Sequence, residues 1–376
     1  MKKNLNGFLD SGATLQLGSG KWSKIKTSLL KPNNDLIVVT SKSCKKFISD
    51  IPSKYLLVIS EEPSLNLIDN YFNEISKIIN KANKTTYIAL GGGSVVDTAK
   101  ILSLMVDNNI KSSKEAIKKT NDVNISEESK IICIPSTAGT GAEITPFSTI
   151  WDKENGIKYS IIASKINREI ILDPEISLSL PEKVTISTGL DSLCQILEST
   201  WSKKANDKSL SAASLGFEYI NKNFYSVINN PIDAESRKEM LFASFLSGVS
   251  ISISNTTLCH SISYPLTSLL NVPHGIACGL TLIEVIKFNS SYKEKFLKNT
   301  FKVTNVEDSE SLVKKILLLF EKVKYKNIIE PYITKIEKNI DKLLPLTISS
   351  RASNNPINAT INDVEKILKN SLNYYK

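Results

Sequence analysis

Residues 85–100 read TTYIALGGGSVVDTAK and carry the clearest structural signal in the chain. The β-branched and apolar run from Thr85 to Leu90 predicts a buried strand. Glycines follow this strand directly, and the apolar pattern from Val95 to Val106 then predicts a helix. A strand that passes through glycines into a helix is typical of the α/β units that build parallel sheets.

The same alternation of strands and helices extends through the first half of the chain. Short β-branched runs predict further strands at residues 35–40, 54–59 and 130–135. Residues 65–82 carry apolar side chains at a period of about 3.6 residues, which predicts an amphipathic helix. We therefore expect an α/β domain over residues 1–180.

The second half has a different texture, because strands give way to long apolar or amphipathic runs after Pro181. These runs predict helices at residues 184–202, 209–225 and 234–254, from near Leu258, and at residues 312–323. We expect a separate all-helical domain over residues 181–376. The expected fold class is therefore α/β plus all-α.

The charge balance argues against one class of partner. The 376 residues include 47 Lys+Arg and 38 Asp+Glu, a formal net charge of +9. The lysines are scattered rather than gathered in a stripe, so we do not expect nucleic acid as a partner. A mild attraction for an anionic small-molecule substrate remains.

Targeting and redox signals favour the cytoplasm. Residues 1–20 contain two lysines but no apolar core, unlike a secretory signal. Residues 240–258 are uncharged but interrupted by Ser, Thr and Asn, which predicts a buried helix rather than a membrane span. The five cysteines are widely spaced without a CxxC pair, which favours free thiols. We expect a cytoplasmic protein with no membrane partner.

The glycine run suits a pyrophosphate. Gly91, Gly92, Gly93 and Ser94 follow a predicted strand and open a predicted helix. Glycines let the backbone approach a phosphate closely, and a helix N-terminus offers free N–H groups and a positive dipole. Ser94 and Asp97 also have the spacing of a capping box. A tight strand-to-helix turn with a good cap is the alternative interpretation.

A second polar cluster, PSTAGTGAE at residues 135–143, follows the strand predicted at residues 130–135. Its hydroxyls and glycines suit a ligand that lies over the carboxyl ends of the strands, where open α/β sheets bind. Loops of this composition are also common as simple connections between elements. The cluster alone does not distinguish the two.

Two further clusters suggest a metal ion. Asp191, Gln195 and Glu198 share one face of a predicted helix, although a solvated polar face would have the same pattern. The chain's two histidines, His260 and His274, lie within fifteen residues of each other. Imidazole plus carboxylate suits a divalent cation, whereas two buried core histidines are the alternative.

Taken in order, these motifs resemble those of the iron-containing, or group III, alcohol dehydrogenase family. The matching segments are GGGSVVDTAK at 91–100, PSTAGTGAE at 135–143, DPE at 173–175, GLDSL at 189–193, CHSISYP at 259–265 and PHG at 273–275. The resemblance covers nearly the whole chain. It implies an N-terminal Rossmann-like dinucleotide-binding domain and a C-terminal helical domain, the dehydroquinate synthase-like fold. It also implies a metal-dependent alcohol dehydrogenase or aldehyde reductase that uses NAD or NADP, and a homodimer.

The resemblance assigns the cofactor site residue by residue. It implies that Gly91, Gly92, Gly93 and Ser94 bind the pyrophosphate, and that the rest of the cofactor contacts Asp97, Ser136, Thr137 and Thr140. NAD-preferring members tend to place an acidic residue where this chain has Ser41, and that acid would repel a 2′-phosphate. Lys42 follows Ser41, so we expect NADP to be favoured over NAD.

The resemblance also implies the metal ligands and the chemistry. Asp191, His260 and His274 match three of the four ligand positions, and Gln195 stands where the family has a third histidine. Fe(II) or Zn(II) would polarise the aldehyde oxygen while the nicotinamide delivers hydride. Tyr264 replaces a histidine thought to relay protons, so Tyr264 and His260 are the candidate catalytic residues, with the cofactor ribose and water as rival proton sources.

One branch of the family is the most similar. Gln195, ESTWS at 198–202, CHSISYPLT at 259–267 and SRASNNP at 350–356 resemble the phosphonoacetaldehyde reductase (hydroxyethylphosphonate dehydrogenase) branch. The implied reaction is reduction of 2-phosphonoacetaldehyde to 2-hydroxyethylphosphonate. Arg351 and Lys158 are the candidates for the phosphonate, with Lys158 also a candidate for the cofactor, although Arg351 also suits a surface helix cap. The alternatives are another small aldehyde, maleylacetate, or a descendant without catalysis.

Overall fold

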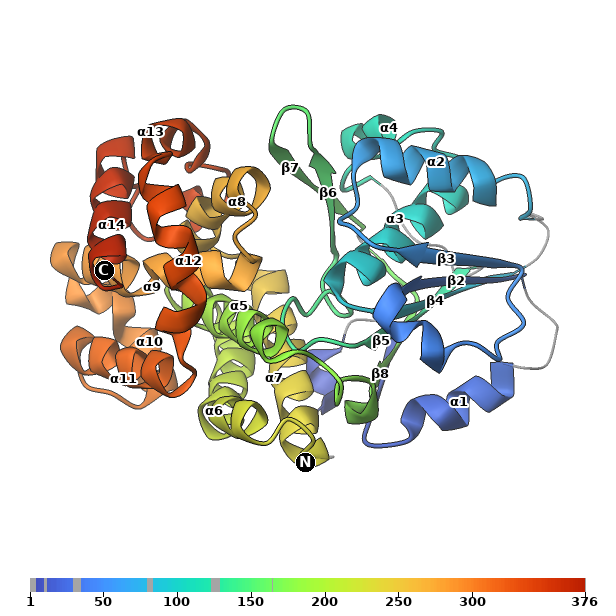
Figure 1. Cartoon of the computed structure of the whole chain (residues 1–376), viewed down its shortest axis with the longest axis horizontal. Coiled ribbons are helices and arrows are strands. Elements are labelled where there is room, and N and C mark those ends of the chain that lie inside the picture. Colours follow the sequence, from blue (N-terminus) through green and yellow to red (C-terminus); the bar gives the residue numbers. More distant parts are fainter. Residues whose placement is uncertain are drawn as a thin grey trace. The chain divides into compact units, whose positions relative to one another are not determined.

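The computed structural model describes residues 5–9, 12–29, 35–79, 84–122, 129–163 and 165–375. The chain divides into two compact units (Figure 1). One unit comprises Met1–Thr137 and Gly141–Ser179, and the other comprises Ala138–Thr140 and Leu180–Lys376. The first holds the strands and the second holds the long helices, as the expected fold class requires.

The first unit is built on a parallel six-stranded sheet in the order β1-β8-β5-β4-β2-β3 (Figure 1). Its strands are β1 (Ala13–Leu17), β2 (Asp35–Ser41), β3 (Tyr55–Ile59), β4 (Thr85–Gly91), β5 (Ser129–Pro135) and β8 (Arg168–Leu172). Strands β2 to β5 confirm the four predicted strands. The sequence patterns missed β1, β8 and the antiparallel hairpin of β6 (Phe147–Asp152) and β7 (Ile157–Ile162).

Helices cover both faces of this sheet, which is why its central strands are apolar throughout. In β2, Ile37 and Val39 pack in the core that includes α2 (Leu65–Ile75) and α3 (Gly93–Asp107). Leu36 and Val38 face the opposite way, into a second core. That core includes residues of α1 (Lys21–Leu29) and of the short helix η2 (Lys42–Phe47). A further short helix, α4 (Ser113–Lys118), follows α3.

The helix predicted over residues 65–82 is shorter in the structure. Helix α2 ends at Ile75, and Ser76 is its C-cap residue. Residues 76–79 continue as turn and irregular backbone, and residues 80–82 lie outside the described residues. The apolar period alone did not mark this end, because Ile78 and Ile79 still pack against the same core after the helix has stopped.

Two buried cations fix the loop that carries the second polar cluster. Lys100 Nζ donates to the carbonyl oxygens of Ala142 at 2.9 Å and Thr145 at 3.2 Å. Arg168 Nη1 donates to the carbonyl oxygens of Glu143 and Thr145, both at 3.0 Å. These hydrogen bonds satisfy backbone groups that would otherwise be buried without partners, and so they hold the segment in one conformation.

The second unit is a bundle of helices. Its longer helices are α5 (Glu182–Trp201), α6 (Asp207–Asn229), α7 (Ala234–Ser254), α8 (Leu258–Leu270), α9 (His274–Tyr292), α11 (Ser309–Lys322), α12 (Tyr325–Glu337) and α14 (Ile361–Asn373). Short helices α10 (Lys298–Thr304) and α13 (Ile340–Leu343) join them. All five helices predicted after Pro181 are present. Their apolar faces form one core, to which α5 and α9 contribute many residues.

Helix α7 includes most of the uncharged run at residues 240–258, and its side chains there are mostly buried. Within the described part of the chain, no single helix is long and apolar enough to cross a membrane. The pair α7 and α8 passes that test by length and composition, but the two helices meet at an angle of 110°.

Candidate active site

The glycine run lies at the carboxyl edge of the sheet. Gly91 is the last residue of β4, Gly92 is the N-cap of α3, and Gly93 and Ser94 lie in its first turn. Gly91 has no room for a side chain, because an added Cβ would overlap Val95. At Gly92 a Cβ would meet Thr137 Oγ1 at 3.4 Å, an ordinary contact. Gly92 therefore lies beside Thr137 at the N-terminus of α3, where backbone N–H groups are available to an anionic ligand.

The carboxyl ends of three neighbouring strands meet at this edge. Thr40 of β2 pairs with Leu90 of β4, and Gly91 pairs with Pro135 of β5. Strand β3 lies on one side of β2, and the next strand in the chain, β4, lies on its other side. The direction in which successive strands are added therefore reverses between β2 and β4. Open α/β sheets bind ligands at such a reversal.

The predicted capping box is wrong. Gly92 caps α3 without a side chain, and Ser94 is already inside the helix. The Asp97 carboxylate instead accepts from the N–H of Thr149 at 3.0 Å and lies 3.5 Å from Lys100 Nζ. Asp97, expected at the cofactor, is therefore engaged within its own unit. Burial is the main cause that raises its pKa, against the opposing effect of Lys100.

The other predicted cofactor residues do not all share this edge. Ser41 ends β2, Ser136 donates its backbone N–H to Gly91, and Thr137 lies beside Gly92. Thr140 groups with the helical unit instead. In that unit, Gly139 packs against α5, and its carbonyl oxygen accepts from Ser192 Oγ at 2.9 Å.

Lys158 lies on β7 and is half-buried. Its ammonium group stands over the Trp151 ring, 5.6 Å from the ring centroid. This cation–π contact accounts for its position within the hairpin.

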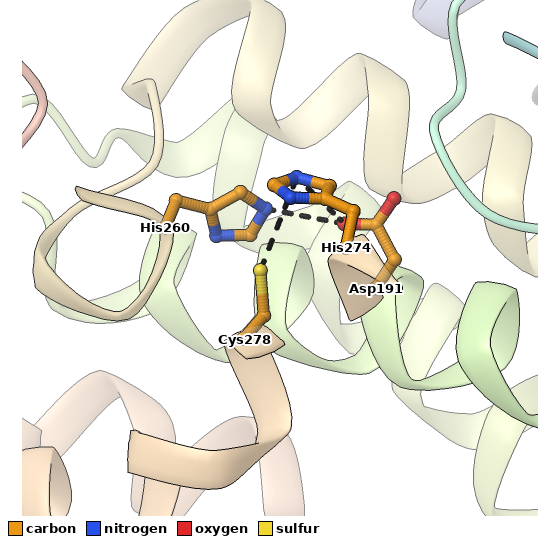
Figure 2. Close-up of side chains that lie close together, drawn as sticks. All are labelled: Asp191, His260, His274 and Cys278. Carbon is orange, nitrogen blue, oxygen red and sulfur yellow. Dashed lines mark hydrogen bonds and ion pairs between the residues drawn. The ribbon is translucent and has the colours of Figure 1, made fainter. Parts of the chain in front are cut away.

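The predicted metal ligands come together in the helical unit (Figure 2). Asp191 lies on α5, His260 in the first turn of α8, and His274 at the start of α9. Cys278, one turn further along α9, completes a group of four donor atoms that all lie within 4.8 Å of one another. His260 Nε2 lies 3.2 Å from Asp191 Oδ1, and His274 Nε2 lies 4.0 Å from the same oxygen.

A glycine brings α9 close enough to α5 for this arrangement. Gly275 follows His274, and an added Cβ there would overlap the backbone oxygen of Ser187 on α5. Any side chain at this position would push the two helices apart. The Pro-His-Gly motif thus places His274 beside Asp191 by close backbone packing.

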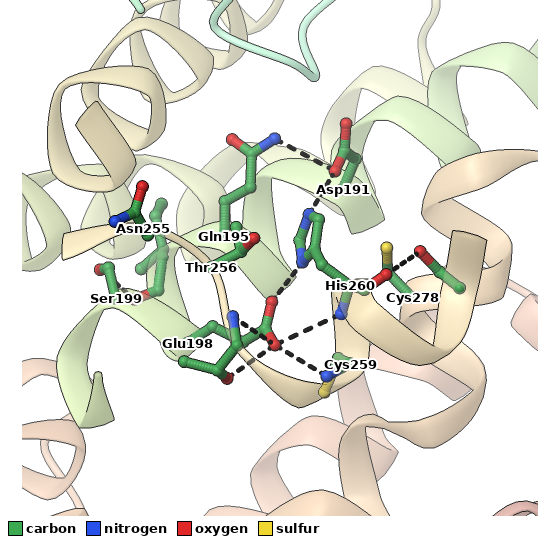
Figure 3. Close-up of polar contacts among 12 residues, drawn as sticks. Asp191, Gln195, Glu198, Ser199, Asn255, Thr256, Cys259, His260 and Cys278 are labelled. Atoms are coloured by element: carbon green, nitrogen blue, oxygen red, sulfur yellow. Dashed lines mark hydrogen bonds and ion pairs between the residues drawn. The ribbon is translucent and has the colours of Figure 1, made fainter. Parts of the chain in front are cut away.

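Both imidazoles are oriented by partners on their far side. His260 Nδ1 contacts Glu198 Oε2 in a short hydrogen bond (Figure 3). Ser263 Oγ donates to the backbone oxygen of His260 at 2.7 Å, and it lies 3.3 Å from His274 Nδ1. With its hydrogen used in this way, the Ser263 hydroxyl accepts from Nδ1–H of His274. Each histidine therefore presents the lone pair of its Nε2 to the cluster, as metal ligands do.

The donors fit a divalent cation. The Asp191 carboxylate and two Nε2 lone pairs are acceptors that converge in a buried place, and a cation or protons must stand among them. Without a cation, burial lowers the pKa of His260, but Cys278, Glu198 and Asp191 outweigh it and raise that pKa well above its usual value. Burial likewise raises the pKa of Cys278, but His260 and His274 bring it down to about 7.

Gln195, predicted as the fourth ligand, is turned the other way (Figure 3). Its Nε2 donates to Asp191 Oδ1 at 3.1 Å. Its Oε1, the atom that could bind a cation, accepts from Ser247 Oγ at 2.8 Å. The structure therefore brings Asp191, His260 and His274 together as donors, and gives Gln195 the role of a hydrogen-bond donor to Asp191.

Tyr264 lies in the middle of α8, and Arg351 is the N-cap residue of the short helix η6 (Ala352–Asn354). The Tyr264 ring stacks on the His274 ring, with centroids 6.0 Å apart and planes 14° apart. Arg351 Nη1 donates to Asn255 Oδ1 at 2.5 Å, in the break between α7 and α8. Asn255 has a left-handed φ of 58°, a strained conformation that costs energy and is common at functional sites.

Sequence reasoning missed Cys278 and gave no role to Glu198. The signal for Cys278 was its position four residues after His274 on a helix, which places both on one face. Glu198 Oε1 also accepts from the backbone N–H groups of Thr257 at 3.1 Å and Cys259 at 2.8 Å. No spacing in the sequence predicts those contacts.

Two family models match the chain. The model for "Iron-containing alcohol dehydrogenase" matches residues 13–174. The model for "Fe-containing alcohol dehydrogenase family, C-terminal" matches residues 185–372. Together they span both units.

Curated relatives give a similar picture. The chain is 33% identical over 213 residues to a phosphonoacetaldehyde reductase of Streptomyces viridochromogenes, covering 54% of this chain and 52% of that protein. It thus matches about half the length of that relative. It is 26% identical over 331 residues to an NADPH-dependent butanol dehydrogenase of Clostridium saccharobutylicum, covering 84% of each.

Solved structures match over nearly the full length. Sulfoacetaldehyde reductase from Bifidobacterium kashiwanohense in complex with NAD+ has a TM-score of 0.78 and 25% identity, over 97% of this chain and 98% of that one. An iron-containing alcohol dehydrogenase from Thermotoga maritima has a TM-score of 0.78 and 22% identity, over 96% and 98%. The second likeness shows the fold, which agrees with the expected two-part architecture.

Proposed function

Because this chain belongs to the iron-containing alcohol dehydrogenase family, we propose that it reduces 2-phosphonoacetaldehyde to 2-hydroxyethylphosphonate with NADPH or NADH. The family supports the coarser statement directly: the chain is an oxidoreductase that acts on an alcohol or aldehyde with NAD(P) and a metal. The convergence of Asp191, His260 and His274 in the helical unit is the observation that carries the proposal.

The proposed chemistry assigns roles to this chain's own residues. A divalent cation held by these donors, such as iron or zinc, would act as a Lewis acid on the aldehyde oxygen. Asp191 supplies the negative charge that holds the cation, and Glu198 and Ser263 keep the two imidazoles pointing at it. Tyr264, stacked on His274, is the proposed proton donor to the developing alkoxide. The cofactor ribose and water are the rival donors.

The proposed cofactor site is the carboxyl edge of the sheet. There the backbone of Gly92 and the first turn of α3 would receive the pyrophosphate. Ser41 ends β2 without a carboxylate to repel a 2′-phosphate, which supports NADPH as the preferred cofactor.

The phosphonate is the substrate feature that this proposal adds. Similarity to the phosphonoacetaldehyde reductase supports it, and so does Arg351, whose planar guanidinium suits an anion with several oxygens. The ammonium group of Lys158 stands over the Trp151 ring, and we propose Arg351 before it as the phosphonate partner. We further propose that the enzyme works as a homodimer in the cytoplasm, where its five buried free cysteines would stay reduced.

Turnover on matched aldehydes tests the proposal. Oxidation of NADPH and of NADH by the purified protein is followed with phosphonoacetaldehyde and with butanal, each with and without a chelator. The expected result is chelator-sensitive turnover that strongly favours the phosphonate. Equal rates on both aldehydes, or turnover of butanal or maleylacetate alone, would reject phosphonoacetaldehyde and keep the family activity. Dinucleotide binding without any turnover would favour a descendant that has lost catalysis.

A further inference from the structure

Three donors of the candidate metal site match the family pattern, and the fourth does not. We propose that Cys278, rather than Gln195, supplies the fourth ligand to the metal ion. This inference rests on the metal site of the proposed function and names a ligand set for it: one carboxylate, two imidazoles and one thiolate. The proton of the Cys278 thiol would pass to solvent as the sulfur–metal bond forms, since a coordinating thiol is deprotonated.

Helix geometry places Cys278 on the correct face. His274 and Cys278 are four residues apart on α9, one turn, so their side chains lie on the same side of the helix. Figure 2 shows the sulfur pointing toward the two imidazoles. Cys278 Sγ lies 3.9 Å from His274 Nε2.

The donor separations suit one metal ion. With metal–nitrogen and metal–oxygen bonds of about 2.0 Å and a metal–sulfur bond of about 2.3 Å, donors spread around one ion lie roughly 3.3 to 3.6 Å apart. Three of the donor pairs are 3.2, 3.9 and 4.0 Å apart, and all four donor atoms lie within 4.8 Å of one another. Side-chain movements that close the wider gaps would bring all four atoms to bonding distance.

Gln195 is committed to other partners. Its amide nitrogen donates to Asp191, and its oxygen lies at Ser247 Oγ. Turning the amide to offer its oxygen would end the hydrogen bond that orients Asp191. The structure thus makes Gln195 a positioning residue for Asp191 and leaves the fourth donor position to sulfur.

The other buried thiols of the helical unit do not share this place. Cys194 lies on α5, where its side chain is part of the apolar core, and Cys259 precedes His260 on α8. Among the residues that the structure describes, the group of four donors includes neither of them. Both are therefore matched controls: fully buried cysteines close to the site whose sulfurs are not proposed ligands.

A thiolate ligand would also influence the choice of metal. Thiolate shifts preference toward zinc and cobalt and away from magnesium and manganese, which favour oxygen donors.

Cobalt substitution tests the ligand without reference to activity. The purified full-length protein is stripped of metal and titrated with Co(II), and its absorption spectrum is recorded. A thiolate ligand gives a strong sulfur-to-cobalt charge-transfer band in the near ultraviolet. We expect this band at one equivalent of cobalt in the wild type, in C194S, in C259S and in Q195A. We expect it to be absent from C278S.

The affinity should follow the spectrum. Loss of an outer-shell partner weakens metal binding about 10- to 100-fold, so loss of a direct ligand in C278S should weaken it by more than about 100-fold. In Q195A, which loses only a group that orients Asp191, we expect a change within about 10- to 100-fold. A C278S protein that bound cobalt as tightly as the wild type would overturn the proposal.

X-ray absorption of the zinc-loaded wild type tests the ligand without a variant, so the result holds even if C278S fails to fold. The expected spectrum contains one sulfur neighbour at about 2.3 Å. Two results would overturn Cys278 as a ligand: a first shell that contains only nitrogen and oxygen, or cobalt binding without a charge-transfer band. If aldehyde turnover were still observed, the proposed function would stand. Absence of any stoichiometric metal binding would overturn the ligand assignment, and absence of aldehyde turnover would overturn the proposed function.

Discussion

The Glu198 carboxylate binds His260 at two places: one oxygen contacts Nδ1 of its ring, and the other lies 3.4 Å from its backbone N–H. The same oxygen accepts from Thr257 and Cys259, so one buried carboxylate organises the whole first turn of α8. An acidic group in this place orients the imidazole and raises its basicity as a ligand.

Replacement of Glu198 by glutamine should therefore weaken the metal site. Gln keeps the shape but loses the negative charge and can turn an NH2 group toward Nδ1. We expect metal affinity to fall about 10- to 100-fold, with the helical content unchanged. Competition with a chromophoric chelator measures the affinity. S199A, a neighbouring substitution at a buried hydroxyl that bonds Ser250, is the control and should keep wild-type affinity.

The two glycines at the sheet edge should differ in their response to substitution. G92V should weaken NADPH binding by about tenfold or more, equivalent to about 1.4 kcal/mol, because its methyl groups would stand where the pyrophosphate approaches. G92A, whose Cβ meets Thr137 at an ordinary distance, should keep the stability of the wild type. G91A should instead destabilise the fold, because its Cβ would overlap Val95. Fluorescence titration and thermal melting separate the two effects, and normal NADPH affinity in G92V would reject the site.

Replacement of Arg351 should change KM for phosphonoacetaldehyde and not for butanal. R351M should raise KM for phosphonoacetaldehyde about 10- to 100-fold, because a charge-assisted hydrogen bond contributes roughly 1.5–3 kcal/mol. Its KM for butanal should stay near the wild-type value. K158M, which removes the rival cation, should change neither constant by more than about threefold by the same energetic scale. An equal effect of R351M on both aldehydes would show a structural role through Asn255 instead.

Tyr264 and His274 should separate proton transfer from metal binding. Y264F keeps the ring stacked on His274 and removes the hydroxyl, so bound metal should be unchanged while kcat falls about 10²- to 10⁴-fold. H274A should lower bound metal and turnover together, because it removes a donor atom. Metal content and steady-state kinetics on the same samples give both readouts. Full turnover in Y264F would assign the proton to the ribose or to water.

Glu143 should make the stability of the α/β unit depend on pH. Burial raises the pKa of Glu143 to about 7, against opposing effects of its own backbone hydrogen bond, Lys100 and Arg168. Its Oε1 is buried without a hydrogen-bond partner among the described residues, as suits a protonated acid. The unfolded chain releases this proton near the usual pKa of 4.5, so the folded chain holds more protons between that pH and about 7.

The extra proton of the folded chain makes its stability fall as the pH rises. The contribution of Glu143 to the free energy of unfolding is greatest near pH 4.5 and is lost as the pH rises through about 7, by up to roughly 3 kcal/mol. Urea unfolding at about pH 5 and about pH 8 measures the change. E143Q removes the titrating group and should flatten the dependence, while E154Q, at an exposed position, should leave it in place. Equal slopes in wild type and E143Q would contradict the assignment.

Buried strands and motif residues could be predicted from the sequence, and contacts between distant helices could not. Strands β2, β4 and β5 are central and covered on both faces, so they appear as continuous apolar runs. The edge strand β3 also has an apolar run, although Leu56 and Val58 are exposed. Strand β8 begins with the charged residues Arg168 and Glu169, so only its end is apolar and the strand pattern is too short to recognise. Strand β1 is an edge strand with mixed burial. The end of α2 escaped prediction because its core continues through irregular backbone.

The same distinction holds at the site. Asp191, His260 and His274 belong to motifs that could be recognised, although only the fold shows that they meet. The contact of Glu198 with His260 joins residues 62 positions apart in the chain, and no local pattern encodes it. Gln195 had the right position for a ligand, but its amide orientation depends on Ser247 of another helix.

The four donors also affect the stability of the folded chain. They lie on three helices, and Asp191 and His260 are 69 residues apart in the sequence. A cation that holds them would close a long loop, as a covalent cross-link does, and would stabilise the folded helices by RT ln(1 + [L]/Kd). The metal would then stabilise the folded helical unit as well as take part in the reaction, and its removal would lower the free energy of unfolding of that unit.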